Sequence, residues 1–185
     1  KTNTSLVTLM LSAFEAFLYR ITGQPDLVVG LPAAGQNVEG LCNLVGHCVN
    51  LLPLRTQINP AQSFSDYLKE RRTALFDAYE HQQFTFGSLL QKLNVPRDPS
   101  RIPLVPVVFN VDIGFAEGFH FEGCRFDVTT NPRFFENFEV FLIASGQGDC
   151  LVLECTFNND LFDGSVMQLR MAEFVGLLDS VVAEP

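Results

Sequence analysis

The stretch DLVVGLP, residues 26–32, indicates how the surrounding sequence folds. It is a short apolar run rich in Val, which is typical of a strand that is buried on both faces. The sequence before it predicts a covering helix, because apolar residues recur at helical spacing between Thr4 and Arg20. Gly23 follows as a candidate left-handed cap for that helix.

The sequence after this strand predicts a mixed sheet with further helices. Pro53 lies within a second strand region, residues 44–58, and indicates an edge strand or a bulge. Ser63 is a candidate cap for a helix that ends near His81. The other expected elements are a helix over residues 86–93, strands within 97–113 and 124–130, a hairpin over 138–157, and a last helix from Asp163 or Ser165 to about Val182. This order predicts an α/β sandwich in which about three helices cover the sheet, as one domain over residues 1–185.

Composition and charge exclude several classes of function. The 185 residues are 47% hydrophobic with 18 Phe and no Trp, which predicts a thick core or an apolar face that meets a partner. The net charge is −9, so we expect neither nucleic acid nor an anionic membrane surface as a partner. No apolar run reaches the roughly 18 residues of a membrane span, and the first residues do not resemble a signal peptide.

The cysteines and histidines do not form a recognisable reactive or metal-binding pattern. The odd set of Cys42, Cys48, Cys124, Cys150 and Cys155 is interpreted as reduced thiols of a cytoplasmic protein. No metal is expected, because Cys42, His47 and Cys48 lack a fourth ligand at zinc spacing, and His81 and His120 stand alone. Cys48 with His47 or His81 would make a nucleophile pair, but neighbours on a strand point to opposite faces, and a structural thiol is the simpler interpretation.

The segment NNDLFDG, residues 158–164, has the outline of a catalytic loop between an apolar strand and a helix. Asn158 and Asn159 stand where two histidines would serve as general base. Asparagine and aspartate are also common in turns and helix caps, so a turn into the last helix is the competing interpretation.

Three further stretches are similar to motifs that occur together in one family of enzyme domains. LVGHCVNLLPLR, residues 44–55, is similar to a Gly-x-Phe-Val-Asn-Thr motif that is followed by Arg, although His47, Cys48 and Leu51 depart from it. HQQFTFGSLL, residues 81–90, is a weaker match to His-Gln-Asp-Tyr-Pro-Phe-Glu. RDPSRIPL, residues 97–104, nearly completes the Arg-Asp-x-Ser-Arg-x-Pro-Leu motif.

The three stretches resemble the motifs of condensation domains of nonribosomal peptide synthetases. This resemblance covers essentially the whole chain and implies a fold. Condensation domains have two lobes, each similar to chloramphenicol acetyltransferase, that is, a two-layer α/β sandwich in which helices cover a mixed sheet. Substrates tethered to carrier proteins by phosphopantetheine arms meet in a tunnel between the lobes. The motifs present here belong to the carboxy-terminal lobe, and the catalytic His-His-x-x-x-Asp-Gly motif belongs to the other one. The resemblance therefore implies the carboxy-terminal half, with the amino-terminal half and peptidyl carrier proteins as partners and no cofactor bound by this chain.

The resemblance also implies roles for individual residues. NNDLFDG becomes the structural counterpart of the catalytic loop, so no catalytic residue is expected in this chain. Near the tunnel we expect Gly46, His47, Asn50 and Asn110, with the loop before Leu44 as the tunnel floor and parts of residues 115–137 as a latch onto the other lobe. As residues of structural motifs we expect Arg97, Asp98, Arg101 and Asp163.

Three functions are compatible with the sequence. The first is a tunnel-shaping half of an enzyme that joins an acyl or peptidyl donor to an aminoacyl acceptor. The second is a non-catalytic docking module for carrier proteins. The third is an acyltransferase or hydrolase that uses Cys48.

Overall fold

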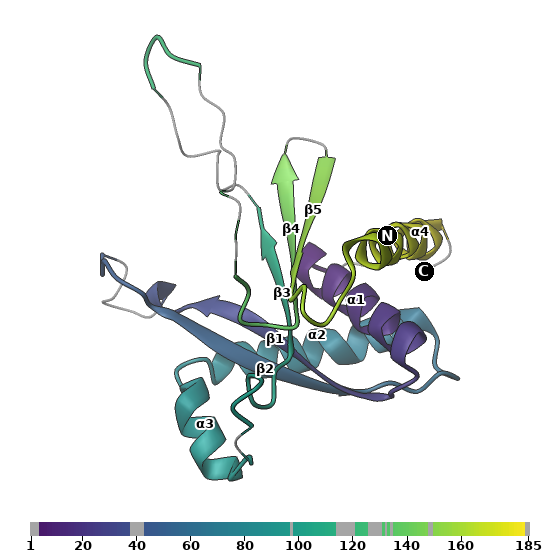
Figure 1. Ribbon diagram of the computed structural model, residues 1–185, viewed down its shortest axis with the longest axis horizontal. Coiled ribbons are helices and arrows are strands. Elements are labelled where there is room, and N and C mark those ends of the chain that lie inside the picture. The colour runs from purple at the N-terminus through teal and green to yellow at the C-terminus, as the bar shows by residue number, and fades with distance from the viewer. Residues whose placement is uncertain are drawn as a thin grey trace.

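The computed structural model describes residues 4–37, 43–96, 98–113, 121–125, 131, 133, 135–147 and 150–183. Helices and strands alternate irregularly along the chain, as Figure 1 shows. The elements are α1 (Leu6–Thr22), β1 (Asp26–Ala34), the 3-10 helix η1 (Gly35–Asn37), β2 (Val49–Gln57), α2 (Phe64–Glu80), α3 (Phe86–Leu93), β3 (Val107–Asp112), β4 (Val140–Gln147), β5 (Cys150–Phe157) and α4 (Gly164–Ala183).

The five described strands form one mixed sheet in the order β2-β1-β3-β4-β5. β1 and β3 are parallel, as are β3 and β4, whereas β2 and β5 pair antiparallel with their neighbours. β2 and β5 are thus the edge strands, which explains why β2 tolerates Pro53. The expected α/β class and mixed sheet are confirmed.

Three helices cover one face of this sheet, and α3 lies on the other side (Figure 1). The apolar stripe of α1 faces β1 and β3, where Phe14 stacks on Phe109 with ring centroids 5.5 Å apart. Phe174 of α4 packs against Phe14 in an edge-to-face arrangement, with ring centroids 5.7 Å apart. These buried aromatic rings account for part of the high Phe content, because each removes a large apolar area from water.

A buried polar network ties α1 to α2. Arg71 donates two hydrogen bonds to the Glu15 carboxylate, each 2.8 Å long, and both side chains are at most 2% exposed. Tyr67 donates to the same carboxylate at 2.7 Å, and its hydroxyl lies 3.0 Å from that of Thr56 on β2. Burial raises the pKa of Tyr67, and the charge of Glu15 adds to the effect, so Tyr67 stays protonated as the donor.

The capping residues expected from the sequence are found at the helix ends. Ser63 accepts a hydrogen bond from the backbone of Asp66 at the start of α2, and Gly23 ends α1 with φ 68°. Asp163 starts α4 by accepting from the backbone of Ser165 at 2.8 Å. These local signals predicted element boundaries correctly because each satisfies backbone groups that a helix end leaves unpaired.

Two expected strand regions differ from the structure. Residues 44–48 are not part of β2, because the ladder with β1 ends at the pair Ala34 and Val49 and β1 gives way to the 3-10 helix η1 at Gly35. The strand expected at residues 124–130 falls mostly outside the described residues, and Cys124 and Arg125 are not in a strand. His120, Cys42 and Arg97 also lie outside the described part of the chain.

Candidate functional site

Two segments that the sequence motifs single out lie against each other at the free edge of β2. One is the end of the loop before β2 with the first β2 residues, and the other is the turn between α2 and α3. They enclose a hollow of about 570 Å³. Its lining includes His47, Cys48, Asn50, Gln82, Gln83 and Thr85. Amides, a hydroxyl, an imidazole and a thiol therefore surround it.

A backbone hydrogen bond beside the hollow joins the residue after β1 to the residue before β2. Gly35 donates from its N–H to the carbonyl of Cys48 at 2.8 Å. A Cβ at position 35 would lie 2.4 Å from that carbonyl oxygen, so only glycine allows this approach. The φ of Gly46 is 156°, a backbone conformation that residues with a side chain rarely adopt. Gly46 and His47 are both exposed. The floor loop expected before Leu44 includes residues 38–42, which lie outside the described residues.

Asn50 joins the two walls of the hollow. Its side-chain amide donates to the carbonyls of Gln82, at 2.7 Å, and Phe84, at 3.0 Å. Its side-chain oxygen accepts from the backbone of Phe86 at 3.1 Å. The turn that follows α2 is thereby fixed to the edge of the sheet.

Asn110 does not lie at this hollow. It is on β3, which β1 separates from β2. Asn50 pairs with Ala33, which belongs to the core under the helices, whereas Asn110 follows Phe109, which faces that core. Because side chains alternate along a strand, Asn50 and Asn110 point to opposite faces of the sheet. The structure thus places His47 and Asn50 at the hollow, whereas Gly46 precedes His47 without lining it and Asn110 lies elsewhere.

Residues 98–104 of the RDPSRIPL segment form a turn that contacts the residue before β4. Asp98 accepts from the backbone and hydroxyl of Ser100, at 2.9 and 2.6 Å, and these bonds lower its pKa. Arg101 lies 3.8 Å from Asp98 and 3.6 Å from Glu139, just before β4. Glu139 in turn accepts from the backbone N–H of Asn158 through its carbonyl, at 3.0 Å. Two of the sequence motifs therefore meet at Glu139, a connection that the sequence did not indicate.

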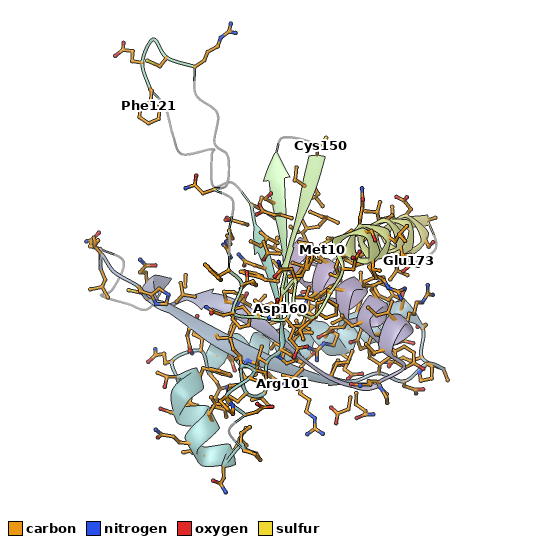
Figure 2. All side chains as sticks on the ribbon, viewed as in Figure 1. Met10, Arg101, Phe121, Cys150, Asp160 and Glu173 are labelled. Carbon is orange, nitrogen blue, oxygen red and sulfur yellow. The ribbon has the colours of Figure 1, made fainter. Side chains whose placement is uncertain are left out.

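The NNDLFDG segment is a tight turn between β5 and α4. The side-chain oxygen of Asn158 accepts a hydrogen bond from the backbone N–H of Asp160 at 2.9 Å. The backbone carbonyl of Asn158 accepts from the backbone N–H groups of Leu161 and Phe162. Asp163 is the cap of α4, and its hydrogen bonds from Ser165 and from the Val166 backbone lower its pKa. Figure 2 shows Asp160 and Arg101 at the same end of the sheet, away from Cys150 at the β4–β5 turn. Asn158 and Asp163 thus shape the backbone here.

The thiols and imidazoles form no reactive pair in the described ranges. Cys48 and His47 share no side-chain hydrogen bond there, and the Nδ1 of His81 lies 2.8 Å from the Asp77 carbonyl. Burial raises the pKa of Cys155 to about 11, so its thiol stays protonated. Among the described residues, no group of three His, Cys, Asp or Glu side chains could hold a metal ion. In the same residues, no helix is both long and apolar enough to cross a bilayer.

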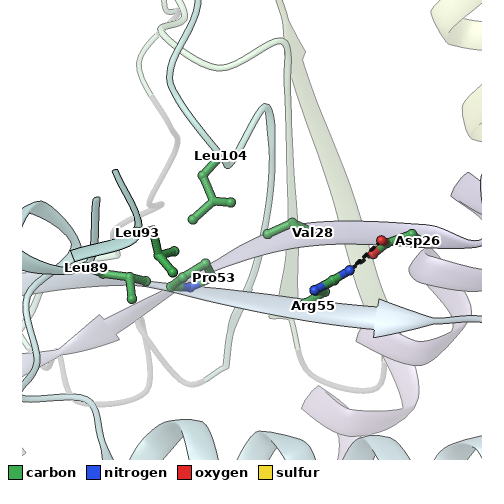
Figure 3. Close-up of a pocket in the computed structure, with 7 residues that line it drawn as sticks. All are labelled: Asp26, Val28, Pro53, Arg55, Leu89, Leu93 and Leu104. Carbon is green, nitrogen blue, oxygen red and sulfur yellow. Dashed lines mark hydrogen bonds and ion pairs between the residues drawn. The ribbon is translucent and has the colours of Figure 1, made fainter. Parts of the chain in front are cut away.

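The face of the sheet opposite the core carries an apolar groove beneath α3. Leu89 and Leu93 of α3 and Leu104 line it, as Figure 3 shows, together with Val28 and Pro53 of the sheet. An exposed ion pair between Arg55 and Asp26, 2.7 Å long, lies at one end. The two charged side chains of this groove pair with each other at the surface, so the hollow at Asn50, where two of the sequence motifs meet, remains the candidate site.

The mixed sheet with helices on both faces defines an α/β protein, and solved condensation domains share this chloramphenicol acetyltransferase-like fold. The family model for the condensation domain matches residues 1–185, so the chain belongs to the condensation-domain family. It is 33% identical over 184 residues to bacitracin synthase 1 of Bacillus licheniformis, and 28% identical over 185 residues to gramicidin S synthase 2 of Brevibacillus brevis. The two alignments cover 98% and 100% of this chain but only 3% and 4% of those proteins.

Solved structures agree on the fold. A four-domain nonribosomal peptide synthetase bound to AMP and glycine matches 98% of this chain with a TM-score of 0.88 at 22% identity, over 15% of its own length. The condensation domain of the monacolin K polyketide synthase matches 96% of the chain, with a TM-score of 0.87 at 21% identity. The X-domain from teicoplanin biosynthesis matches 100%, with a TM-score of 0.86 at 19% identity. The chain spans 41% and 43% of these last two chains.

Proposed function

We propose that this chain is the carboxy-terminal half of a condensation domain of a nonribosomal peptide synthetase. Such a domain joins a donor acyl or peptidyl group to an aminoacyl acceptor through an amide bond, with both substrates tethered to carrier proteins by phosphopantetheine. The family match over residues 1–185, and the span of about two-fifths of solved single domains, support a half rather than a whole.

The turn at residues 158–164 is the observation that carries this proposal. It has the spacing of the catalytic motif at the end of a strand, yet Asn158 and Asn159 occupy the histidine positions. A neutral amide does not take up a proton near neutral pH, so neither residue serves as general base for an attacking amine. The hydrogen bonds of Asn158 instead close the turn. The general base therefore comes from the amino-terminal half, which is the first partner we propose.

The contribution of this half is to orient the substrates and to exclude water from them. We propose that Gly46, His47 and Asn50 lie on the wall of the tunnel, with Asn110 on the other face of the sheet as a further candidate. A wall that holds both tethered groups in reacting geometry lowers the entropic cost of bringing them together. The latch expected in residues 115–137 belongs to the same proposal, and most of it lies outside the described residues.

A graft tests this proposal. Residues 1–185 would replace the matching segment of a condensation domain of bacitracin synthase 1, and amide formation between two loaded carrier proteins would be measured by mass spectrometry. We expect the graft to form product, and an Asn159→Ala variant to stay within about twofold of it because the side chain takes no part in proton transfer. A loss of activity in the Asn159 variant, or a folded graft that binds carriers without forming product, would contradict the proposal.

A second function has one observation in its favour. The fold also matches the X-domain from teicoplanin biosynthesis, which has been solved in a complex with OxyB. A docking role without turnover would fit the asparagines of the 158–164 turn equally well. Binding of carriers or another protein by a graft that forms no amide would favour this second function. The Cys48 mechanism gains no support from the described residues, where this thiol has no hydrogen bond to His47 or His81.

A further inference from the structure

The side-chain amide of Asn50 has no unused N–H donor. Its two N–H groups point to the carbonyls of Gln82 and Phe84, at 2.7 and 3.0 Å, and its oxygen accepts from Phe86. An asparagine amide has only two N–H donors. A ligand in the hollow therefore finds no free N–H on Asn50, which argues that the residue acts on the protein and not on a substrate.

The partners of Asn50 are backbone groups of a segment that crosses the free edge of β2. This segment leaves α2 on one side of the sheet and enters α3 on the other. Thr85 caps α3 by accepting from the Ser88 backbone at 3.2 Å, and Thr85 lies between two partners of Asn50. One side chain thus fixes the crossing segment and the start of α3.

The same contacts set the distance between the two walls of the hollow. His47 and Cys48, which shortly precede Asn50 in the chain, form one wall. Gln82, Gln83 and Thr85 form the other wall. In the described residues no other side-chain hydrogen bond joins these two walls. Without Asn50, two carbonyls and one N–H would exchange a protein partner for water, and the wall would be free to move.

We propose that Asn50 is a positioning residue that holds residues 82–86 against the edge of β2 and so sets the width of the hollow. This inference rests on the proposed function in one respect: the hollow must lie on the path of the tethered substrates for its width to affect turnover. The expected effect is on the binding of those substrates, since Asn50 supplies no proton and no free donor to them.

Amide hydrogen exchange in chain 1–185 tests the structural part. Asn50→Asp keeps the shape and the acceptor but removes both donors and places negative charge before two carbonyls, and Asn50→Ala removes all three bonds. We expect the Phe86 amide to exchange at least about tenfold faster in Asn50→Ala, which corresponds to about 1.4 kcal/mol, the size of one or two lost hydrogen bonds. Asn59→Asp makes the same chemical change in a loop where Asn59 only accepts, from Ala61, and should leave Phe86 unchanged.

Kinetics in the grafted condensation domain test the functional part. Asn50→Asp should raise KM for the carrier-tethered substrates at least about tenfold while kcat changes less, because positioning acts on binding. Unchanged exchange at Phe86 in Asn50→Ala would overturn the proposal that Asn50 holds this segment, whatever the activity. Faster exchange with unchanged KM would show that Asn50 acts only on the fold, and would overturn its positioning role.

Absence of product from the unsubstituted graft would instead count against the proposed function, and the exchange result would still decide whether Asn50 holds the segment. If Asn50→Ala does not fold, Asn50→Asp gives the exchange result through the Phe84 amide, which bonds to the His81 carbonyl and should exchange faster once both donors to the segment are lost.

Discussion

Glu15 and Arg71 show how a single polar pair stabilises the interior of this protein. Both are almost fully buried, and Tyr67 adds a third hydrogen bond to the carboxylate. Taking two charges out of water is costly, and the pair offsets this cost only while its geometry is complete. The network therefore contributes more to fixing the angle between α1 and α2 than to the total stability.

Glu15→Gln should destabilise the protein by about 3–5 kcal/mol, because it leaves the Arg71 guanidinium buried without a counter-charge. The free energy of unfolding in urea measures this directly. Asp26→Asn removes an exposed pair with Arg55 and serves as the control, with little expected change. Replacing both buried partners, as Glu15→Leu with Arg71→Met, should recover much of the loss. A double variant that is weaker than Glu15→Gln would contradict this account.

At the scale of single elements, the start of α4 depends on Asp163. Its carboxylate accepts from the Ser165 and Val166 backbones, and these bonds lower its pKa. A group whose pKa is lower in the folded state stabilises the fold at pH values above its unfolded pKa, which is about 3.9. This stabilisation is lost as the pH falls through the folded pKa.

Asp163→Ala should therefore lower the thermal midpoint at pH 7, and by less than Glu15→Gln does because Asp163 is exposed. The difference from the unsubstituted protein should shrink as the pH falls below about 3.9, where the carboxyl is protonated first in the unfolded chain and then, at its lower pKa, in the folded protein. Thermal melts followed by circular dichroism between pH 3 and 7 measure it. A difference that stayed constant over that range would show that the carboxylate is not the stabilising group.

The elements also show which features the sequence could predict. Caps at Ser63, Gly23 and Asp163 and the edge position of Pro53 were predictable, because each depends on neighbours in sequence. The hydrogen bonds of Asn50 with residues 82–86 and the ion pair of Arg101 with Glu139 were not, because they join positions more than 30 residues apart. No local pattern indicates which backbone groups a folded edge strand will meet.

At the scale of the whole molecule, one apolar surface beside the core remains open. We call it the α4 groove, lined by Met10, Leu151, Leu153, Met171, Val175 and Leu178 along the free edge of β5. Val175 and Leu151 are 46% and 45% exposed. An uncovered edge strand next to apolar side chains is a site for association with another chain or segment. We expect the partner surface, which the high Phe content predicts, at this groove, which aliphatic side chains line.

We expect chain 1–185 to bind an apolar dye and to associate with itself in sedimentation. Val175→Glu with Leu151→Glu should reduce both, since charge at the α4 groove opposes its burial. Leu169→Glu is the matched control, because Leu169 is on the same helix and 66% exposed but does not line the groove. A monomer without dye binding, or equal effects of the control, would count against a partner at this surface.

The central claim is that this chain supplies walls and contacts for amide formation but no general base. The most direct measurement is amide product formed by purified chain 1–185 from a donor-loaded and an acceptor-loaded carrier protein, with an intact condensation domain of bacitracin synthase 1 as the positive control. The account predicts product only with the intact domain, and none above the carrier-only background with chain 1–185. Turnover by chain 1–185 above that background would contradict it.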